Sequence, residues 1–230
     1  MVETVRSFFT NWDIYKLCIE HNTLFHREVG TILRARLRAR TAPFTFLDLA
    51  CGDATLTAAA LRGTAVRSFT GVAFSAAALA LAKENTRELG CPCEFLEADF
   101  AGYLRKATGA FDVIYLGLSL HHFERAEKRD LVRQIFRITA PGGEFYLYEP
   151  ILHGGESREE CLARWKRLMD TRYKDFPQAA RDALWEHVST ADRPETVADY
   201  IASAKDAGFS GGEVLFTDCE NTYSLMSFSR

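Results

Sequence analysis

Short apolar runs alternate with longer amphipathic segments along the first two thirds of the chain. The apolar runs have the length and near-continuous hydrophobic character of strands that are covered on both faces of a sheet. The longer segments have helical length, and Gly or a small polar residue marks several of their ends. The pattern predicts strands at 44–50, 66–73, 93–99, 111–117 and 144–149, and helices at 53–62, 75–89, 100–107 and 122–140. This alternation implies right-handed crossovers and a parallel sheet.

Helical patterns flank the alternating region on both sides. Residues 5–40 are mainly helical in character, and residues 156–188 predict one or two helices with no strand between them. Residues 194–207 predict a further helix that stops at Gly208. Two strands joined by a short link, which we expect to form an antiparallel hairpin, close the chain at 213–218 and 222–228.

The fold class that follows is α/β. A seven-stranded, mostly parallel sheet carries helices on both faces and ends in the antiparallel C-terminal hairpin. The length of 230 residues suits one domain. Its expected parts are an N-terminal helical lid (1–43), a core (44–150), a helical insert (151–192) and a closing helix with the hairpin (193–230).

Composition and charge narrow the class of protein. Hydrophobic residues make up 47% of the chain and charged residues 26%, which is typical of a globular protein. The net charge of −3 argues against a nucleic-acid partner, and no apolar run is long enough to predict a membrane span. The N-terminus lacks the pattern of a secretory signal, and the six cysteines lack the CxxC spacing of a zinc site. We therefore expect reduced thiols and a cytoplasmic location, whereas no pattern determines the oligomeric state.

The segment after the first strand carries the most informative pattern, LDLACGDATL at 47–56. The small residues Ala50, Gly52 and Ala54 let a ligand approach the backbone closely, and the helix that follows offers free N–H groups. Asp48 lies at the strand end, where an open parallel sheet places its ligand crevice. A tight strand-to-helix turn without a ligand is the alternative interpretation.

Five blocks in this order and spacing resemble the class I S-adenosylmethionine-dependent methyltransferases, which have a Rossmann-like fold. The blocks are LDLACGDATL, FTGVAFSAAALALAK, EADF, FDVIYLGLSLHHF and APGGEFYLYEP. The resemblance covers residues 44 to about 150, and the closing helix and hairpin at 194–228 fit the family's last elements. It implies S-adenosylmethionine as cofactor and methyl transfer as the reaction. The N-terminal helices and the insert would then cover the site and select a small-molecule substrate.

The resemblance also implies which residues bind the cofactor. The first block passes beside the methionine part of the cofactor, with Ala50 and Ala54 where the family usually has glycines. Phe74 would lie against the adenine, and Asp99 would accept a hydrogen bond from its amino group, with a helix N-cap as the alternative role. The expected cofactor-binding residues are Asp48, Ala50, Gly52, Asp53, Ala73, Phe74, Asp99, Phe100, Gly117 and Leu118.

Ala73 is the main departure from the family pattern. The family usually has an acidic residue here that accepts hydrogen bonds from both ribose hydroxyls, and hydrogen bonds to charged groups contribute about 1.5–3 kcal/mol. Either Asp53 or Ser75 reaches the ribose instead, or backbone and water do, or the methyl-transfer chemistry is altered or lost. An NADP-dependent Rossmann enzyme is a further alternative, since no carboxylate would repel a 2′-phosphate, but the glycine spacing argues against it.

His121 and His122 are the candidate catalytic residues. They follow the strand at 111–117, so the resemblance places them near the transferring methyl group, where an imidazole could accept a proton from a hydroxyl or amine. A structural role toward the backbone is the alternative for one of them. No metal site is expected, because side chains of adjacent residues point apart and further ligands are lacking. A base is optional, because alignment alone supplies much of the rate.

Tyr15, His26 and Glu149 are the candidate substrate contacts. A single helix over 12–33 would place Tyr15 and His26 on the same face of that helix. A helix cap at 21–23 would instead split the segment into two helices, and the two side chains would no longer share a face. Glu149 is expected at the mouth of the crevice, as a ligand for a cationic group or as a base, with an ordinary surface carboxylate as the alternative.

Two further segments have simpler interpretations. Aromatic residues at helical spacing in the insert favour core packing, and a flap over a small-molecule pocket is the alternative. Asp192 and Arg193 precede a predicted helix and are expected to cap it.

Overall fold

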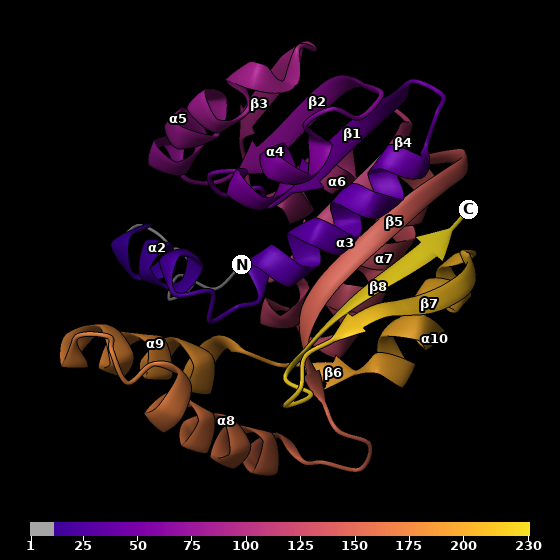
Figure 1. Ribbon diagram of the computed structural model, residues 1–230. Coiled ribbons are helices and arrows are strands. Elements are labelled where there is room, and N and C mark those ends of the chain that lie inside the picture. The colour runs from indigo at the N-terminus through magenta and orange to yellow at the C-terminus, as the bar shows by residue number, and fades with distance from the viewer. Residues whose placement is uncertain (1–11) are drawn as a thin grey trace.

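The computed structural model describes residues 12–230 and is built around one central sheet (Figure 1). Its strand order is β3-β2-β1-β4-β5-β8-β7, so seven strands follow this path in the described chain, as predicted. The neighbouring strands from β3 to β5 are parallel, and β8 is antiparallel to both β5 and β7. The strands are β1 (Phe44–Leu49), β2 (Val66–Ala73), β3 (Cys93–Glu97), β4 (Phe111–Gly117), β5 (Thr139–Leu152), β7 (Ser210–Thr217) and β8 (Tyr223–Ser229). An additional two-residue strand, β6 (Glu195–Thr196), pairs with β5 outside this path.

Helices cover both faces of the sheet, and each face has its own hydrophobic core. The side chains of β1 point alternately to the two faces of the sheet. Phe44 and Phe46 pack in the core on the face of α3 and α4, and Leu47 and Leu49 pack in the core on the face of α6, α7 and α10. The helices are α2 (Trp12–Glu20), α3 (His26–Ala39), α4 (Thr55–Leu61), α5 (Ala76–Asn85), α6 (Phe100–Lys106), α7 (Arg125–Ile138), α8 (Arg158–Arg172), α9 (Gln178–Ala191) and α10 (Val197–Ala207), with short 3₁₀ turns η1 (Arg87–Leu89) and η2 (Leu120–His122). No helix of the described chain combines the length and apolar character needed to cross a bilayer.

The N-terminal segment is split into two helices, so a single helix over 12–33 is the wrong alternative. The break lies at the predicted cap site. Asn22 and Phe25 both take a positive φ of 53°, and Asn22 Oδ1 accepts a hydrogen bond from the backbone N–H of Arg27 at 3.0 Å. This side-chain acceptor satisfies a donor at the start of α3 and thereby fixes the new helix direction.

The helix predicted at 122–140 is shorter in the structure. A capping box between Glu124 and Glu127 starts α7 at Arg125, and the preceding residues form η2 instead. Residues 141–143, which contain a proline and two glycines, belong to the start of β5 and do not terminate the helix directly. The outcome is that the histidine pair lies in a tight turn between β4 and α7.

The insert forms a helical pair, α8 and α9, at the same end of the sheet as α2 (Figure 1). Trp165 and Met169 of α8, Leu184 of α9 and Tyr173 between the two helices are all buried. The helical insert and the first described helix therefore pack toward the carboxyl ends of the strands, where the sheet leaves its ligand crevice.

Candidate functional site

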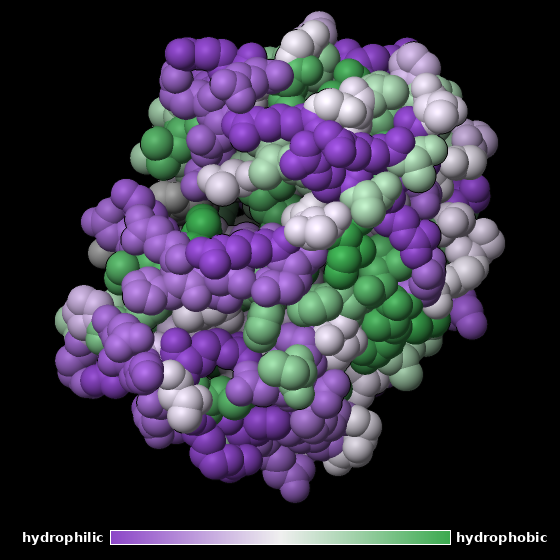
Figure 2. Space-filling view, in the orientation of Figure 1, coloured by the Kyte–Doolittle hydropathy of each residue, from purple (hydrophilic) through white to green (hydrophobic). Residues whose placement is uncertain are grey.

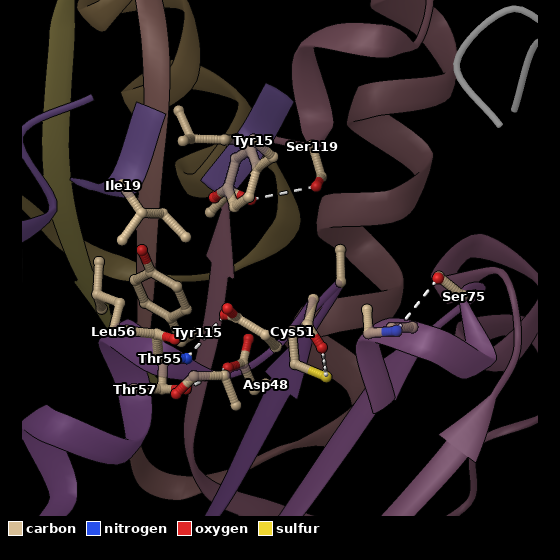
Figure 3. A pocket seen from close by; sticks show the side chains of 18 of the residues that line it. Tyr15, Ile19, Asp48, Cys51, Thr55, Leu56, Thr57, Ser75, Tyr115 and Ser119 are labelled. Atoms are coloured by element: carbon tan, nitrogen blue, oxygen red, sulfur yellow. Dashed lines mark hydrogen bonds between the residues drawn. The ribbon is translucent and has the colours of Figure 1, made fainter. Parts of the chain in front are cut away.

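The carboxyl ends of β1, β2 and β4 surround a cavity of about 790 Å³, which we call the strand-end cavity. Tyr15 and Ile19 of α2 lie on one side of it, across from Asp48 and Thr57 (Figure 3). On the surface, a hollow with hydrophobic residues at its base opens between α2 and the α4–α5 side of the sheet (Figure 2). Most of the predicted cofactor residues line this cavity, namely Asp48, Ala50, Gly52, Asp53, Ala73, Phe74, Gly117 and Leu118.

The loop between β1 and α4 has an unusual backbone. Ala50, Gly52 and Ala54 all have left-handed conformations, with φ of 61°, 54° and 54°. For residues with a Cβ atom this region carries a penalty of roughly 1–2 kcal/mol, so the two alanines are strained where glycine would not be. The backbone N–H of Cys51 donates to the carbonyl of Val72 at 2.9 Å and ties the loop to β2. The alanines thus keep the shape of a glycine-rich loop and add two methyl groups to the cavity wall.

Asp48 is the buried carboxyl group of the strand-end cavity. Its side chain accepts a hydrogen bond from Thr57 Oγ1 at 2.5 Å, and the residue is only 2% exposed. Burial raises the pKa of Asp48 to about 7; the hydrogen bond from Thr57 opposes the increase, and the charge of Asp53 adds to it. A nearby cation would favour the ionised form, so this site gains from a positively charged ligand. Thr57 was not among the predicted residues, since a threonine inside an Ala-rich helix gave no signal.

The end of β2 lacks a carboxylate, as the sequence predicts. Ala73 lines the cavity, and both candidate replacements, Asp53 and Ser75, line it too. Ser75 Oγ caps α5 by accepting from Ala78 N at 3.3 Å, and Asp53 Oδ1 accepts from Thr55 N at 3.0 Å. Each candidate therefore has a local partner as well as a place in the cavity wall.

Asp99 and Phe100 do not line the strand-end cavity. Asp99 is the N-cap of α6, where its carboxylate accepts from Ala101 N at 3.4 Å. Phe100 is buried and packs edge-to-face on Phe123, with ring centroids 5.4 Å apart. The observed contacts correspond to the capping role, and the adenine contact stays a prediction.

Tyr15 and His26 meet across the break between α2 and α3. Tyr15 Oη lies 3.0 Å from His26 Nε2, and both residues line the strand-end cavity. The turn at 21–25 folds α3 back toward α2, so the two side chains come together although they do not share one helix. Burial lowers the pKa of His26 to about 4, so its imidazole is neutral at physiological pH.

A second cavity of about 520 Å³ adjoins the first, and we call it the lid cavity. The two cavities share Tyr15 and Leu118 in their walls. The helices α2, α8 and α9 and the loop after β4 supply most of the lining, which is largely apolar and aromatic. Its other residues are Cys18, Leu24, His121, His122, Pro150, Trp165, Tyr173, Leu184, His187, Val188, Asp192 and Tyr223. The predicted catalytic histidines therefore belong to the wall of the lid cavity.

Glu149 does not lie at the mouth of the crevice, so that expectation is wrong. Its side chain is fully buried beneath the loop after β4. The carboxylate accepts backbone N–H groups of Ser119, Leu120 and His121 at 2.9, 2.9 and 3.0 Å, and it lies 2.5 Å from His121 Nδ1. Burial by itself would raise the pKa of Glu149, but His121 and these N–H groups hold it below its ordinary value. Glu149 therefore orients η2 and His121 from within the core.

Asp192 also departs from its expected role. Thr196, not Asp192, caps α10, by accepting from Asp199 N at 3.1 Å. Asp192 ends α9 instead, and its buried side chain turns toward the histidine pair. The backbone N–H of the next residue, Arg193, donates to the carbonyl of His121 at 2.8 Å and docks this segment on η2.

Three imidazoles surround the Asp192 carboxylate, and we call the group the histidine–aspartate cluster (His121, His122, His187 and Asp192). The distances to Asp192 Oδ1 are 3.5 Å from His121 Nε2, 3.2 Å from His122 Nδ1 and 3.7 Å from His187 Nε2. The rings of His121 and His122 are 4.0 Å apart between centroids, so the adjacent side chains converge, contrary to expectation. The tight turn of η2 presents both rings to the end of α9.

The cluster shifts the pKa values of its histidines in different directions. Burial would lower the pKa of His121, but the charges of Asp192 and Glu149 raise it above its ordinary value. Burial and the neighbouring His121 lower the pKa of His122, and burial lowers that of His187 to about 4. His187 and Asp192 were not predicted as site residues, because nothing local connects a helix end in the insert with a turn some 65 residues earlier.

Residues 46–143 match the model of a family described as "Methyltransferase domain". The matched segment runs from β1 into β5 and includes all the strand-end loops of the first cavity. No curated protein matches the sequence.

Several solved structures share the fold at low sequence identity. The magnesium protoporphyrin IX methyltransferase ChlM from Synechocystis PCC 6803, with bound SAH, superposes with a TM-score of 0.67 at 15% identity over 98% of each chain. An O-methyltransferase family protein from Burkholderia thailandensis gives a TM-score of 0.63 at 19% identity, covering 90% of this chain and 57% of that one. The [4+2]-cyclase SpnF gives 0.62 at 15% identity, covering 88% and 80%. The chain thus spans little more than half the length of some matched structures, and the likeness concerns the fold.

Proposed function

We propose that this protein transfers a methyl group from S-adenosylmethionine to a small molecule held in the lid cavity. Residues 46–143 match the model of a methyltransferase domain, and the chain shares the fold of a solved methyltransferase with bound SAH, which supports this proposal. The observation that carries the proposal is the pair of adjoining cavities. One lies at the strand ends, the other lies under α2, α8 and α9, and Tyr15 and Leu118 belong to both. A transfer between two bound molecules needs such a junction.

The residues of the strand-end cavity fit S-adenosylmethionine. It is a concave site at the strand ends that combines apolar side chains with a few polar groups, as small-molecule sites do. The positive-φ loop at Ala50, Gly52 and Ala54 gives close access to the backbone. Asp48 is a buried carboxyl group whose ionised form a cation would stabilise, and the cofactor carries both an ammonium and a sulfonium group.

In this proposal Asp53 accepts the hydrogen bonds from the ribose of the cofactor. Asp53 is an acidic residue that lines the same cavity as Ala73, where the family pattern lacks its usual carboxylate. Asp53→Asn is expected to weaken binding of S-adenosylhomocysteine about tenfold, the loss of one hydrogen bond to a charged group. Asp206→Asn, an exposed carboxylate on α10, is the matched control and should leave the affinity unchanged. Unchanged affinity in Asp53→Asn would assign the ribose to Ser75 or to the backbone.

Bound S-adenosylmethionine supplies a methyl group that is already activated on a sulfonium. The chain has to hold the acceptor in line with that group and keep water out, and alignment of this kind can supply several kcal/mol. Tyr15 and Leu118, at the junction of the cavities, are placed to define the approach. His121 and His122 line the acceptor's cavity, which makes them the candidates for assisting proton removal.

The residues that line the lid cavity indicate the chemical class of the methyl acceptor. Trp165, Tyr173 and Tyr223 offer aromatic surfaces, and the polar side chains come mainly from the histidine–aspartate cluster. A compact molecule with an aromatic or apolar body and one nucleophilic group satisfies both parts of this lining.

Two measurements on the purified protein test the proposal. Titration calorimetry should show micromolar binding of S-adenosylhomocysteine and none of NADP; the reverse result would refute the cofactor assignment. Incubation of a metabolite extract with the protein and methyl-labelled S-adenosylmethionine should then give a labelled small molecule by mass spectrometry. Cofactor binding without any labelled product would instead support the alternative that the missing carboxylate at Ala73 raises, namely altered or lost chemistry on a methyltransferase fold.

A further inference from the structure

The histidine–aspartate cluster has the spacing of a metal site. His121 Nε2 and His122 Nδ1 lie 3.5 and 3.2 Å from Asp192 Oδ1. Zinc bonds of about 2.0–2.2 Å at tetrahedral angles place neighbouring ligand atoms about 3.3–3.5 Å apart. One ligand atom from each of these three residues falls within 4.8 Å of the other two. An ion can therefore reach all three with little movement of the side chains.

The charge of the cluster also suits a divalent cation. Asp192 and Glu149 are both buried, so the cluster and its support bring two carboxyl groups together inside the protein. The buried cation Lys128 directs its hydrogen bonds away from the two carboxyl groups, to the carbonyl of Arg193 and to Glu195. A bound M²⁺ would add a second, positive partner for carboxylates that are taken out of water. The cluster also lies at the carboxyl end of α9, where the helix dipole favours a cation.

The surroundings orient the ligands as they do in known metal sites. A metal-bound histidine usually donates its other ring N–H to a carboxylate or carbonyl, which fixes the tautomer and the ring. Glu149 stands 2.5 Å from His121 Nδ1 and leaves Nε2 directed at Asp192. Glu149 is itself held by three backbone N–H groups, so this orientation is built into the turn.

We propose that His121, His122 and Asp192 bind a divalent transition-metal ion, with Zn²⁺ as the best-suited candidate. Imidazole and carboxylate ligands suit zinc, and three protein ligands leave a fourth position free for a substrate or water. All three residues line the lid cavity, so that position faces the acceptor. His187 approaches Asp192 Oδ1 from α9 and stabilises the carboxylate from the side.

The proposal that the cluster binds a metal ion does not depend on the proposed function. The role of that ion in methyl transfer does depend on it. If the protein methylates a hydroxyl or amine in the lid cavity, an ion at this position lowers the pKa of that group in place of a protein base. This use rests on the proposed function; the metal site itself rests only on the geometry of η2 and the end of α9.

The experiment uses the full-length, untagged protein, since a histidine tag would bind zinc. The chain is stripped with a chelator, dialysed against Zn²⁺ and measured by elemental mass spectrometry. We expect close to one zinc per chain, and a rise in the thermal unfolding midpoint on adding Zn²⁺. The Co²⁺-loaded protein should show the intense visible absorption of a tetrahedral or five-coordinate site. Less than about a tenth of an ion per chain, with no shift of the midpoint, would overturn the proposal.

Variants locate the site. Asp192→Asn and His122→Gln are near-isosteric and should each lower zinc affinity at least tenfold, as loss of a ligand does. His153→Ala removes a histidine outside the cluster and should bind zinc as the parent does. Zinc binding that survives in Asp192→Asn would place the metal elsewhere and refute the assignment. Calorimetry with S-adenosylhomocysteine on the same samples separates the two proposals: cofactor binding without zinc refutes only the metal site, and zinc without cofactor binding refutes only the methyltransferase assignment.

Discussion

Asp48→Asn tests the most unusual electrostatic feature of the strand-end cavity. The substitution removes the ionisable group but keeps the shape of the side chain and an oxygen that can accept from Thr57. Any pH-dependent difference between parent and variant therefore reports the ionisation of Asp48. The carboxyl group is 2% exposed, so solvent screens it little in the folded state.

The magnitude follows from the raised pKa. In the folded protein the pKa of Asp48 is about 7, against an ordinary value of 3.8. Between these values the unfolded chain has released the proton while the folded chain retains it, so stability falls as pH rises. The slope is about 1.4 kcal/mol per pH unit, which sums to about 4 kcal/mol over the whole interval and becomes constant above pH 7. The asparagine variant lacks this loss, so its stability relative to the parent should grow by about 2 kcal/mol between pH 5 and pH 7, where the slope declines as folded Asp48 begins to ionise.

Urea unfolding of both proteins at pH 5, 6, 7 and 8 measures this difference. Asp206→Asn is the control, because it removes the same charge from an exposed position on α10. Its curve should run parallel to that of the parent. Parallel curves for Asp48→Asn as well, or a difference that shrinks with rising pH, would refute the assignment of a raised pKa to Asp48.

The same ionisation should be visible in ligand binding. A cationic cofactor favours ionised Asp48, so the affinity of the parent for S-adenosylmethionine should increase as pH rises toward 7 and level off above it. The affinity of Asp48→Asn should lack this dependence. A dependence of equal size in both proteins would mean that another group responds to the cofactor.

Three further substitutions have expected outcomes. Ala54→Gly relieves a residue at φ 54° and should raise the free energy of unfolding by up to about 1 kcal/mol in urea denaturation. Gly117→Ala places a Cβ 2.5 Å from Tyr115 Oη and should destabilise by about 1–3 kcal/mol, with weaker binding of S-adenosylhomocysteine in calorimetry. Glu149→Gln leaves His121 and the backbone N–H groups of η2 poorly paired and should lower the unfolding free energy by about 3–5 kcal/mol; a neutral result would contradict its structural role.

The element pattern of the core was predictable because it is local. The burial of alternate residues in β1 and the apolar runs of β2 and β4 are encoded in neighbouring positions, so their predicted bounds agree with the structure. Boundaries were less accurate where side-chain caps decide them. The Glu124–Glu127 capping box moved the start of α7, and Asn22 divided the N-terminal segment.

Eight of the ten predicted cofactor residues line the strand-end cavity. Loops after adjacent parallel strands must meet at one edge of the sheet, so a motif placed at a strand end is placed at the crevice. Asp99 and Phe100 are the exceptions, since the first residues of α6 serve as a helix cap and as core packing.

The sequence by itself determined the α/β core and the position of the cofactor crevice. It also determined that helices outside this core, at the N-terminus and in the insert, are available to cover the crevice. Each of these features depends on periodicity or on strand order. Only the tertiary structure decided that Glu149 is an internal support for η2, that Tyr15 meets His26, and that Asp192 draws three imidazoles together. Apart from the contact between His187 and Asp192, these contacts join residues 11 to 71 positions apart in the sequence. Such packing depends on the shapes of whole buried surfaces, and no local pattern of residues records it.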